Sequence, residues 1–334
     1  MKYTIATLAS HSCLQILKGA KDEGFATLAI STPKGYDFYK RFKFIDEVVK
    51  IAHYNDFYKL QKELLPKNVI IIPHGSFVAY LGRDYGKKLI LKQYGNKSVL
   101  EWESNRVKQM RWLQKAGLRL PKIFSKPEEI DRTVMVKLHG ARGGEGYFIV
   151  RNKKEFDQKI QKFDGQKYII QEYIVGVPVY LQFFYSLLSK SVELLGIDRR
   201  YESNVDGIGR LPSFYQDQVN CTPSYTVIGN FPIVIRESLL PYAYQMAQKV
   251  IEVSQKLIDP KGLYGPFCLE TIVTSDCQFY PIEISCRIVA GTNLFSQGSP
   301  YSDYHFGIPM STGRRIAREI KEAIKLNKLN KILD

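Results

Sequence analysis

The first 95 residues alternate between short apolar runs and helical patterns, and this alternation limits the possible folds more than any other feature of the chain. Strand-like runs occupy residues 3–9, 26–31, 48–51 and 69–73, and helical patterns occupy 11–23 and 56–65. A rhythm of strand, helix and strand predicts an open parallel sheet. Ligands of such sheets bind beyond the carboxyl ends of the strands. We therefore expect an α/β protein with a ligand site at that edge.

Polar clusters follow two of the expected strands. Residues 10–12 (Ser-His-Ser) come after the first strand, and residues 73–76 (Pro-His-Gly-Ser) come after the fourth. Each cluster precedes a helical pattern, so its backbone N–H groups could receive an anion such as phosphate. The alternative is simple capping of the two helices by their serines. Because two such corners fall on one edge of the sheet, a ligand site is favoured.

A glycine-rich segment covers residues 134–148. The sequence predicts a strand that contains Lys137, a turn that carries Arg142, and a second strand. Glycines allow the main chain to approach a polyphosphate closely, the lysine supplies a point charge, and the arginine supplies a fork of donors. Residues 170–176 then offer a carboxylate, an aromatic and an aliphatic side chain for an adenine slot. Together these segments predict an ATP site; the alternative is a hairpin without a ligand, because the glycine spacing matches neither common nucleotide fingerprint.

Two late apolar segments each carry one glutamate. Residues 267–272 contain Glu270 and residues 279–287 contain Glu283, and a turn around Ser275 and Asp276 joins them. We expect a pair of antiparallel strands. Charged groups are seldom placed among apolar neighbours without a partner, and two facing glutamates beside a polyphosphate suit Mg²⁺. The alternative is that the glutamates pair with Arg287 and another basic side chain.

The remaining segments have simpler patterns. The sequence predicts one long helix at 101–117, two strands within 179–198, a charged corner at 198–204, a long loop or lid at 205–227, a helix at 236–257 and an amphipathic helix with a basic outer face at 314–331.

The composition excludes several classes of protein. Of the 334 residues 45% are hydrophobic and 24% charged, as in ordinary globular proteins, and no apolar run reaches the roughly 18 residues of a membrane span. The amino terminus enters a strand without a signal-peptide layout, which predicts a cytoplasmic protein with no membrane partner. Five cysteines, without a C-x-x-C pair, argue against a disulfide framework or a zinc site. The net charge of +15 raises nucleic acid as a partner, but the excess is spread along the chain, and anionic nucleotide substrates or a thermophilic lysine-rich surface explain it equally well. Nucleic acid is therefore not the expected partner.

The order of these parts resembles the ATP-grasp superfamily. Within it, the chain is similar to the archaeal formate-dependent FAICAR synthetases over residues 3 to 333. The segments that carry this closer resemblance are Ala9–His11, Pro73–Ser76, Gly140–Gly144, Arg200–Asn204, Gly229–Pro232, Arg236–Pro241, Gly265–Cys268, Glu283–Ser285 with Arg287, Gly291–Asn293 and Arg314–Lys321.

The resemblance implies a fold and an activity. A Rossmann-like (pre-ATP-grasp) domain would span residues 1–98 and the ATP-grasp region 99–334, with the glycine loop and hinge in about 120–180 and the metal- and substrate-binding part in 181–334. The enzyme would be an ATP-dependent ligase that joins formate to the amine of AICAR (aminoimidazole carboxamide ribonucleotide), giving FAICAR, ADP and phosphate through formyl phosphate. Its cofactor would be Mg²⁺ or Mn²⁺, and it would form a homo-oligomer, either a trimer or a hexamer.

The resemblance also implies roles for individual residues. Those that would contact AICAR are His11, Ser76 and Asn230; those that would contact ATP are Lys137, Gly140, Arg142, Gly143, Gly144, Gly146, Glu172, Tyr173, Ile174 and Glu202. The metal would lie on Glu270 and Glu283, and the catalytic side chains would be Lys137, Arg142 and Arg287, the last binding formate or the developing oxyanion unless it pairs with Glu283. Ser285 stands where the superfamily usually has asparagine.

Two other functions stay open. One is a paralogous ATP-grasp ligase that joins a different acid to a different amine or phosphoribosyl acceptor. The other is a nucleotide- or RNA-binding regulator without turnover, which the retention of Lys137, Glu270 and Glu283 disfavours because a binding module has little need of metal carboxylates.

Overall fold

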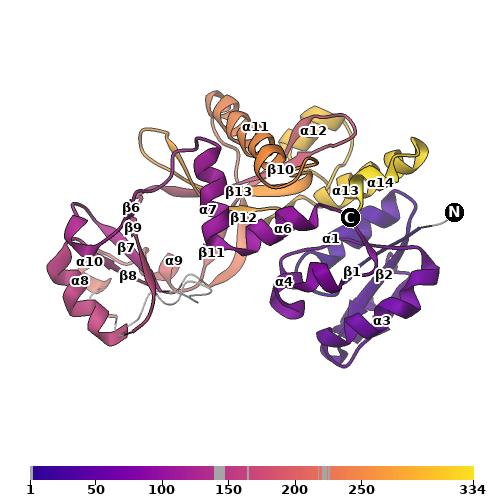
Figure 1. Ribbon diagram of the computed structural model, residues 1–334, viewed down its shortest axis with the longest axis horizontal. Coiled ribbons are helices and arrows are strands. Elements are labelled where there is room, and N and C mark those ends of the chain that lie inside the picture. Colours follow the sequence, from indigo (N-terminus) through magenta and orange to yellow (C-terminus); the bar gives the residue numbers. More distant parts are fainter. Residues whose placement is uncertain (1–2, 139–146, 164, 217, 220–223, 225) are drawn as a thin grey trace.

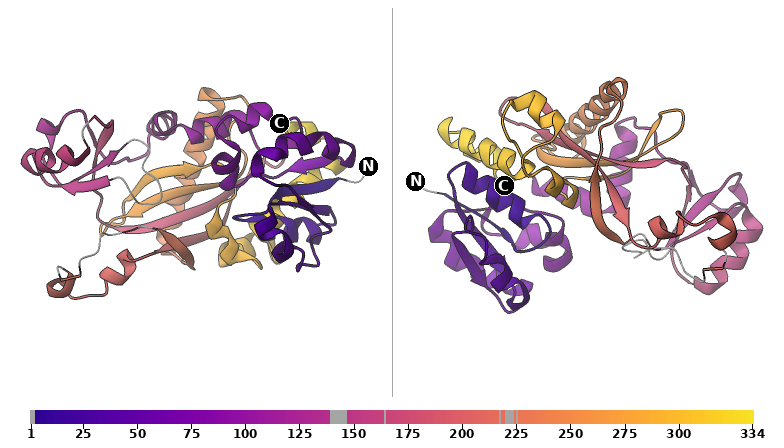
Figure 2. Two further views of the ribbon diagram at one scale, coloured as in Figure 1. Left: turned by 90° about the horizontal axis from the view of Figure 1, so that it is seen from below. Right: turned by 180° about the vertical axis from the view of Figure 1, so that it is seen from behind.

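The computed structural model describes residues 3–138, 147–163, 165–216, 218–219, 224 and 226–334. It contains three sheets arranged in a row, with a parallel sheet at one end, a long antiparallel sheet in the middle and a small antiparallel sheet at the other end (Figure 1). The views from below and behind show the same order (Figure 2).

The first part of the chain forms the parallel sheet that its rhythm predicts. Its strands are β1 (Thr4–Leu8), β2 (Ala26–Ser31), β3 (Glu47–Lys50), β4 (Val69–Ile71) and β5 (Lys92–Gln93), in the order β3-β2-β1-β4-β5. The helices that connect or follow them are α1 (Cys13–Asp22), α2 (Pro33–Tyr39), α3 (Phe57–Leu64), α4 (Ser76–Leu81) and α5 (Tyr85–Lys88). Strands β1 and β2 are buried almost throughout, as expected for a parallel sheet packed on both faces.

The middle sheet is antiparallel and has the order β12-β11-β10-β13-β14. Its strands are β10 (Val177–Tyr185), β11 (Val192–Glu202), β12 (Val227–Pro232), β13 (Gly265–Val273) and β14 (Phe279–Ser285). Because side chains alternate between the faces, the register separates an apolar row through Leu181, Leu269 and Ile284 from a polar row through Glu270 and Glu283. Helices α11 (Leu240–Leu257) and α12 (Pro300–Phe306) contact β11. The predicted pairing of the two late strands is confirmed.

The small sheet has the order β6-β9-β7-β8, with all its pairs antiparallel. Its elements are β6 (Ile123–Phe124), β7 (Val134–Leu138), β8 (Tyr147–Val150), β9 (Tyr168–Glu172) and α8 (Lys153–Ile160). Phe156 of α8 packs with Val134, Val136 and Ile170 in a core separate from the larger core that the other two sheets share.

Helix α1 and helix α13 (Thr312–Lys325) cross with their backbones in contact. A Cβ atom on Gly19 would lie 2.1 Å from Arg314 N, and one on Gly313 would lie 2.3 Å from Gln15 O. The buried Glu23 binds Arg314, Arg318 and Lys321 of α13. The parallel sheet is therefore fixed to the last part of the chain.

The end of the chain also joins the parallel sheet. After α14 (Leu329–Ile332), the backbone of Asp334 exchanges two hydrogen bonds with Gln93 of β5, and its carboxylate accepts from Lys97 N at 2.7 Å. The predicted tail helix thus consists of two helices that anchor a sheet edge.

The predicted long helix at 101–117 is wrong. The structure has two helices, α6 (Lys97–Ser104) and α7 (Arg106–Lys115), which share Asn105 as a boundary. Asn105 is extended (φ −110°, ψ 108°), and its side chain accepts from the N–H groups of Val107 and Lys108. An asparagine that satisfies the free N–H groups of a helix start favours the break.

The predicted charged corner at 198–204 is also wrong in part, because residues 198–202 are the end of β11. The predicted loop at 205–227 contains two short helices, α9 (Val205–Ile208) and α10 (Ser213–Gln216). In the described part of the chain, no helix is both long and apolar enough to cross a membrane.

Candidate active site

The two corners after β1 and β4 meet at the edge of the parallel sheet. We call Ser10–Ser12 and Pro73–Ser76 together the histidine corner. The rings of His11 and His74 stack with their centroids 5.3 Å apart and their planes 2° from parallel. The hydroxyl oxygens of Ser10 and Ser76 lie 3.1 Å apart. The structure therefore brings together the side chains that the sequence placed at one sheet edge.

His74 is held as one neutral tautomer. Its Nε2 lies 2.9 Å from Leu8 O, and its Nδ1 lies 3.2 Å from Ser76 N. Because a carbonyl only accepts and a backbone N–H only donates, Nε2 carries the hydrogen and Nδ1 does not. Burial lowers the pKa of His74 to about 4, which keeps it in this state at neutral pH.

His11 is strained and neutral. Its φ of 53° is in the left-handed region, which residues other than glycine rarely adopt and which is found often at functional sites. The protein around its ring, then the nearby His74 and the positive Arg287 and Arg200, lower its pKa to about 3. The residue as a whole is exposed, although protein surrounds much of its ring.

The two glutamates predicted to bind a metal face each other. Glu270 on β13 is in register with Glu283 on β14. Glu270 Oε1 lies 2.8 Å from Arg200 Nη2, and Ser285 Oγ donates to the same oxygen at 3.3 Å. Burial and the negative charge of Glu270 raise the pKa of Glu283 to about 7. Glu270 already has a cationic partner in Arg200, whereas a cation bound beside the buried Glu283 would offset its burial and the negative charge of Glu270.

The glutamates do not form a complete metal cage by themselves. Among the described residues, no group of three or more His, Cys, Asp or Glu side chains is arranged to hold a metal ion. A metal here would need further oxygen ligands, such as those of phosphate or water. Mg²⁺ prefers this kind of coordination, with a few carboxylates and several ligands from substrate and solvent.

Arg287 pairs with Glu103, a partner that the sequence did not indicate. Arg287 Nη2 lies 3.2 Å from Glu103 Oε1, and the other carboxylate oxygen accepts from Cys286 N at 2.7 Å. Glu103 lies at the end of α6, just before the break at Asn105. Of the alternative in which the glutamates pair with Arg287 and another basic side chain, one part holds, because Glu270 pairs with Arg200, and the pairing with Arg287 is wrong. Burial raises the pKa of Glu103, while the charge of Arg287 opposes that shift.

Arg287 also borders the histidine corner. A Cβ atom on Gly75 would lie 2.8 Å from His11 Nε2 and 3.5 Å from Arg287 Cζ. The positive charge of Arg287 lowers the pKa of His11 and of His74. The same charge interacts with the carboxylates of Glu270 and Glu283. The guanidinium therefore lies between the corner and the carboxylates.

The segment after β14 joins the histidine corner to the middle sheet. Ile288 forms an isolated β-bridge with His74, and Val289 O accepts from Ser12 Oγ at 3.3 Å. Asn293 Nδ2 donates to His11 O at 3.2 Å. These contacts fix the position of the corner relative to the polar face of the middle sheet.

Asn230, predicted to contact AICAR, lies on β12 and is bound to Asp198 of β11. Its Nδ2 donates to Asp198 Oδ2 at 2.7 Å. Asp198 is almost fully buried, and burial raises its pKa to about 6. The sequence indicates Asp198 only as the start of a charged corner, and its contact with Asn230 was missed.

Lys137 lies on the face of the small sheet opposite α8 and is partly buried there. Its Nζ donates to Gln171 Oε1 at 2.6 Å. Burial and the positive Arg106 lower its pKa to about 8, while Glu283 acts in the opposite direction. Lys137 and Glu283 are therefore close enough for their charges to interact. Arg106 is the first residue of α7, and no pattern in the sequence indicates its contact with this site.

The other predicted ATP contacts are only partly described. Gly140, Arg142, Gly143, Gly144 and Gly146 lie outside the described residues. Glu202 is half-buried at the end of β11, and burial raises its pKa.

Of the predicted hinge residues, Glu172 is the last residue of β9, and Tyr173 and Ile174 lie between β9 and β10. Glu172 is in register with Val134, so it lies on the α8 face rather than the Lys137 face. Its carboxylate accepts from Lys122 N at 3.1 Å and pairs with Arg132 at 2.9 Å. Tyr173 N donates to Thr133 O, and Ile174 is half-buried. Any nucleotide beside Lys137 would therefore meet the backbone of this hinge rather than the side chain of Glu172.

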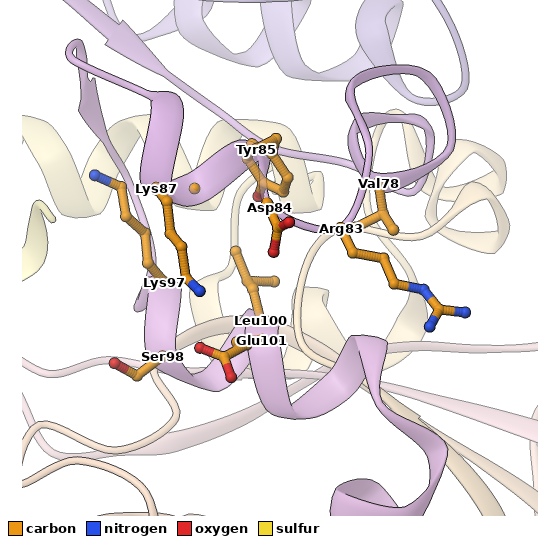
Figure 3. Close-up of a pocket in the computed structure, with 10 residues that line it drawn as sticks. Val78, Arg83, Asp84, Tyr85, Lys87, Lys97, Ser98, Leu100 and Glu101 are labelled. Carbon is orange, nitrogen blue, oxygen red and sulfur yellow. The ribbon is translucent and has the colours of Figure 1, made fainter.

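A pocket of about 260 Å³ lies apart from these residues (Figure 3). Arg83, Lys87 and Lys97 contribute its positive charges, and Leu100 and Glu101 of α6 line it. No residue of the predicted site is among its lining, so it is not the candidate active site.

Several comparisons place the chain among known proteins. One family model, described as a protein of unknown function (DUF1246), matches residues 5–124, and another, a domain of unknown function (DUF1297), matches residues 150–334. A protein of Pyrococcus horikoshii is 48% identical over 98% of this chain and 99% of its own length, and one of Saccharolobus solfataricus is 47% identical with the same coverage. Both are named 5-formaminoimidazole-4-carboxamide-1-(beta)-D-ribofuranosyl 5′-monophosphate synthetase.

Solved structures agree with this relationship. The IMP biosynthesis protein PurP from Thermococcus kodakaraensis superposes with a TM-score of 0.80 at 33% identity, over 99% of this chain and 100% of that one. An ADP complex of N5-carboxyaminoimidazole ribonucleotide synthetase has a TM-score of 0.68 at 14% identity, over 95% of this chain and 76% of that one. The second likeness shows the fold alone. The predicted ATP-grasp fold with an N-terminal Rossmann-like sheet is confirmed.

Proposed function

The chain belongs to the family of the archaeal 5-formaminoimidazole-4-carboxamide ribonucleotide synthetases, and on this basis we propose how its site joins formate to AICAR. The enzyme is an ATP-dependent ligase of IMP biosynthesis that converts AICAR to FAICAR and releases ADP and phosphate. The observation that carries this function is the identity of nearly one half to named synthetases over almost the entire chain.

The first chemical step activates formate. A carboxylate is a poor acylating agent because its leaving group would be oxide or hydroxide. An oxygen of formate attacks the γ-phosphorus of ATP, ADP departs, and formyl phosphate forms with phosphate as its leaving group. Such phosphoryl transfer depends mainly on positioning and on neutralising the charge of the phosphates.

The side chains near Lys137 suit that task. Lys137 would hold the terminal phosphates, and a bound polyphosphate would favour its charged form. Arg142 and the glycines at 140, 143, 144 and 146 would add donors, as the sequence predicts. The hinge from Glu172 to Ile174 would contact the adenine through its backbone, and Glu202 would contact the nucleotide from the middle sheet.

Glu270 and Glu283 would hold Mg²⁺. Their facing register and the raised pKa of Glu283 fit a site that is completed by a cation. Such an ion, or Mn²⁺ on the same oxygen ligands, supplies positive charge against the phosphates.

The second chemical step takes place at the histidine corner. His11, Ser76 and Asn230 would bind AICAR so that its amine faces the formyl carbon. Attack by the amine gives a tetrahedral oxyanion, and loss of phosphate and a proton gives FAICAR. Arg287, held in place by Glu103, would stabilise that oxyanion or position formate.

Formyl phosphate hydrolyses readily, so water has to be excluded while it exists. We propose that the segment 205–227 closes over the site together with the glycine-rich hairpin. We also propose that the enzyme is a homo-oligomer, a trimer or a hexamer, which light scattering on the purified protein would test.

The decisive experiment measures both products. Purified protein is incubated with ATP, Mg²⁺ and formate, with and without AICAR, and ADP and FAICAR are quantified. We expect ADP and FAICAR in equal amounts, dependent on both formate and AICAR. Binding of ATP without any AICAR-dependent product would contradict the proposal and indicate a ligase with another acid or acceptor.

A further inference from the structure

Three side chains from three neighbouring strands form a continuous hydrogen-bonded chain on the polar face of the middle sheet. We call Gln182 of β10, Asp198 of β11 and Asn230 of β12 the amide triad. Gln182 Nε2 donates to Asp198 Oδ1, and Asn230 Nδ2 donates to Asp198 Oδ2 at 2.7 Å. Gln182 and Asp198 are 3% and 1% exposed. The central carboxylate is thus buried with both its oxygens engaged.

The backbone of Gly291 lies directly against this carboxylate. A Cβ atom on Gly291 would come within 2.3 Å of Asp198 Oδ1. Gly291 belongs to the same turn (Ala290–Phe295) as Asn293, which donates to the carbonyl of His11. One short segment therefore contacts both the amide triad and the histidine corner, where AICAR is proposed to bind.

The chemistry of a carboxylate fixes the orientation of both amides. A side-chain amide has two donors on its nitrogen and only an acceptor on its oxygen, whereas an ionised carboxylate can only accept. The nitrogens of Gln182 and Asn230 must therefore face Asp198. Their carbonyl oxygens, Gln182 Oε1 and Asn230 Oδ1, face away from it and accept no hydrogen bond from any other described residue.

We propose that Asp198 is a positioning residue that presents the carbonyl oxygens of Gln182 and Asn230 to the N–H groups of the bound substrate. This inference rests on the proposed function and adds the basis of its specificity. The 5-amine and the 4-carboxamide of AICAR both offer N–H donors, which two fixed acceptors would recognise. Asp198 acts through the two amides and does not itself touch the substrate.

Two fixed acceptors would also reject a close analogue. The ribonucleotide with a 4-carboxylate in place of the carboxamide keeps the ring, the amine and the phosphate. It presents only acceptors at the 4-position, so its oxygens would face carbonyl oxygens without a hydrogen between them. Sites that hydrogen-bond a substrate discriminate strongly against analogues that leave their polar groups unpaired.

The test exchanges one acceptor of the triad for a donor. In Asp198→Asn the new NH₂ group at position 198 faces the amide of either Gln182 or Asn230. That amide has to turn its oxygen toward position 198, and it then presents its NH₂ group, instead of its oxygen, to the substrate. We expect the KM for AICAR to rise about tenfold or more, with a smaller change in kcat, in line with one lost hydrogen bond in the site. The ratio of kcat/KM for the carboxamide over the carboxylate should fall, while the Kd for ADP should stay unchanged.

A second substitution should restore the original pattern. In the double variant Asp198→Asn, Asn230→Asp, the new amide at position 198 accepts from Gln182 and donates to the new carboxylate at position 230. The second oxygen of that carboxylate is an acceptor, and it again faces the substrate. We expect the preference for the carboxamide to return. Gly291→Ala, which presses on Asp198 without changing its chemistry, should weaken the same preference. Asp46→Asn, which changes a carboxylate just before β3, serves as the control.

The outcomes separate the two proposals. If the wild-type protein makes no FAICAR, the proposed function fails. If the wild type is active but Asp198→Asn keeps both its KM for AICAR and its preference for the carboxamide, only the role of the amide triad is overturned. If Asp198→Asn does not fold, as circular dichroism would show, Gly291→Ala decides the question, and an unchanged preference in it overturns the proposal.

Discussion

The two halves of the site differ in how their polar groups are satisfied. In the histidine corner, both ring nitrogens of His74 are bound by backbone groups, and Ser10 and Ser76 lie within hydrogen-bond distance of each other. Near the carboxylates, Glu270 and Lys137 also have hydrogen-bond partners, but like charges lie close together there. Burial and a like charge raise the pKa of Glu283 to about 7, and the same two causes lower the pKa of Lys137 to about 8.

This difference shows which half is complete before substrates bind. The histidine corner is a rigid, neutral surface whose shape is set by the protein. The half that contains Glu270, Glu283 and Lys137 carries charges that are poorly accommodated until ligands of opposite charge arrive. We therefore expect changes of charge in the half with Glu270, Glu283 and Lys137 to affect turnover. Changes of shape in the histidine corner should instead affect the KM for AICAR.

The largest effect is expected for Glu283→Gln, which removes one charge from the proposed metal site. Loss of charge stabilisation at a phosphoryl-transfer site lowers kcat by roughly 10²–10³-fold. ADP release reports the rate, and fluorescence titration reports nucleotide binding, which should remain measurable. Glu252→Gln on the exposed side of α11 is the control. Unchanged turnover in Glu283→Gln would remove the metal assignment.

Gly75→Ala tests the rigid half. The added methyl group would lie 2.8 Å from His11 Nε2, so His11 has to move. Misplacement of a binding group by about 1 Å can cost up to about 100-fold, and we expect the KM for AICAR to rise by about 10- to 100-fold with an unchanged KM for ATP. In the matched variant Gly86→Ala the nearest atom would be 3.7 Å away, and both constants should stay as in the wild type. A parallel rise in the KM for ATP would contradict the division into two halves.

The pH dependence of ATP binding tests the charged half. With a pKa of about 8, Lys137 is protonated at pH 7 and loses its charge as the pH rises. The KM for ATP should therefore increase between pH 7 and pH 9, by up to about tenfold for one lost cation. Lys137→Arg keeps its charge over this range and should lose the part of the increase that comes from Lys137, so its profile should be clearly shallower. The same slope in both proteins would assign the titration to another group.

The smallest effect is expected at the break between α6 and α7. Asn105→Ala removes the cap of α7 and should lower the free energy of unfolding by about 1 kcal/mol. Asn152→Ala removes a similar cap from α8 and should cost about as much. Only Asn105→Ala should also reduce kcat, because Glu103 and Arg106 flank Asn105. Thermal unfolding and ADP release on the two variants check this, and equal kcat values would show that the break has no role in catalysis.

Local patterns predicted most of the elements correctly. Strand β2 and the facing register of Glu270 and Glu283 follow from apolar runs with clear turn signals between them. The failure at 101–117 also has a local cause. The apolar spacing continues through Asn105, which predicted one helix. The side chain of Asn105 instead accepts hydrogen bonds from the first N–H groups of α7, so α6 ends before it and α7 begins after it. A capping residue inside an amphipathic pattern was the signal that would have corrected the prediction.

The missed site residues have a different origin. Glu103 meets Arg287, and Asp198 meets both Asn230 and the backbone of Gly291. These contacts join segments that are distant along the chain, and no spacing within either segment indicates the other. Only the pairing of the strands and the turn after β14 brings them together. The roles of the predicted ATP and AICAR contacts remain predictions until the variants are measured.

The crossing of α1 and α13 bears on how the enzyme moves. Two helices whose backbones touch at Gly19 and Gly313 cannot slide past each other without a collision, so the parallel and middle sheets behave as one rigid body. The small sheet has a hydrophobic core of its own and is joined to the middle sheet through the hinge that follows β9. Opening for ATP and closing around formyl phosphate should then combine a rotation of the small sheet with the closure proposed for residues 205–227. The acceptor site would stay still while the nucleotide is carried to it.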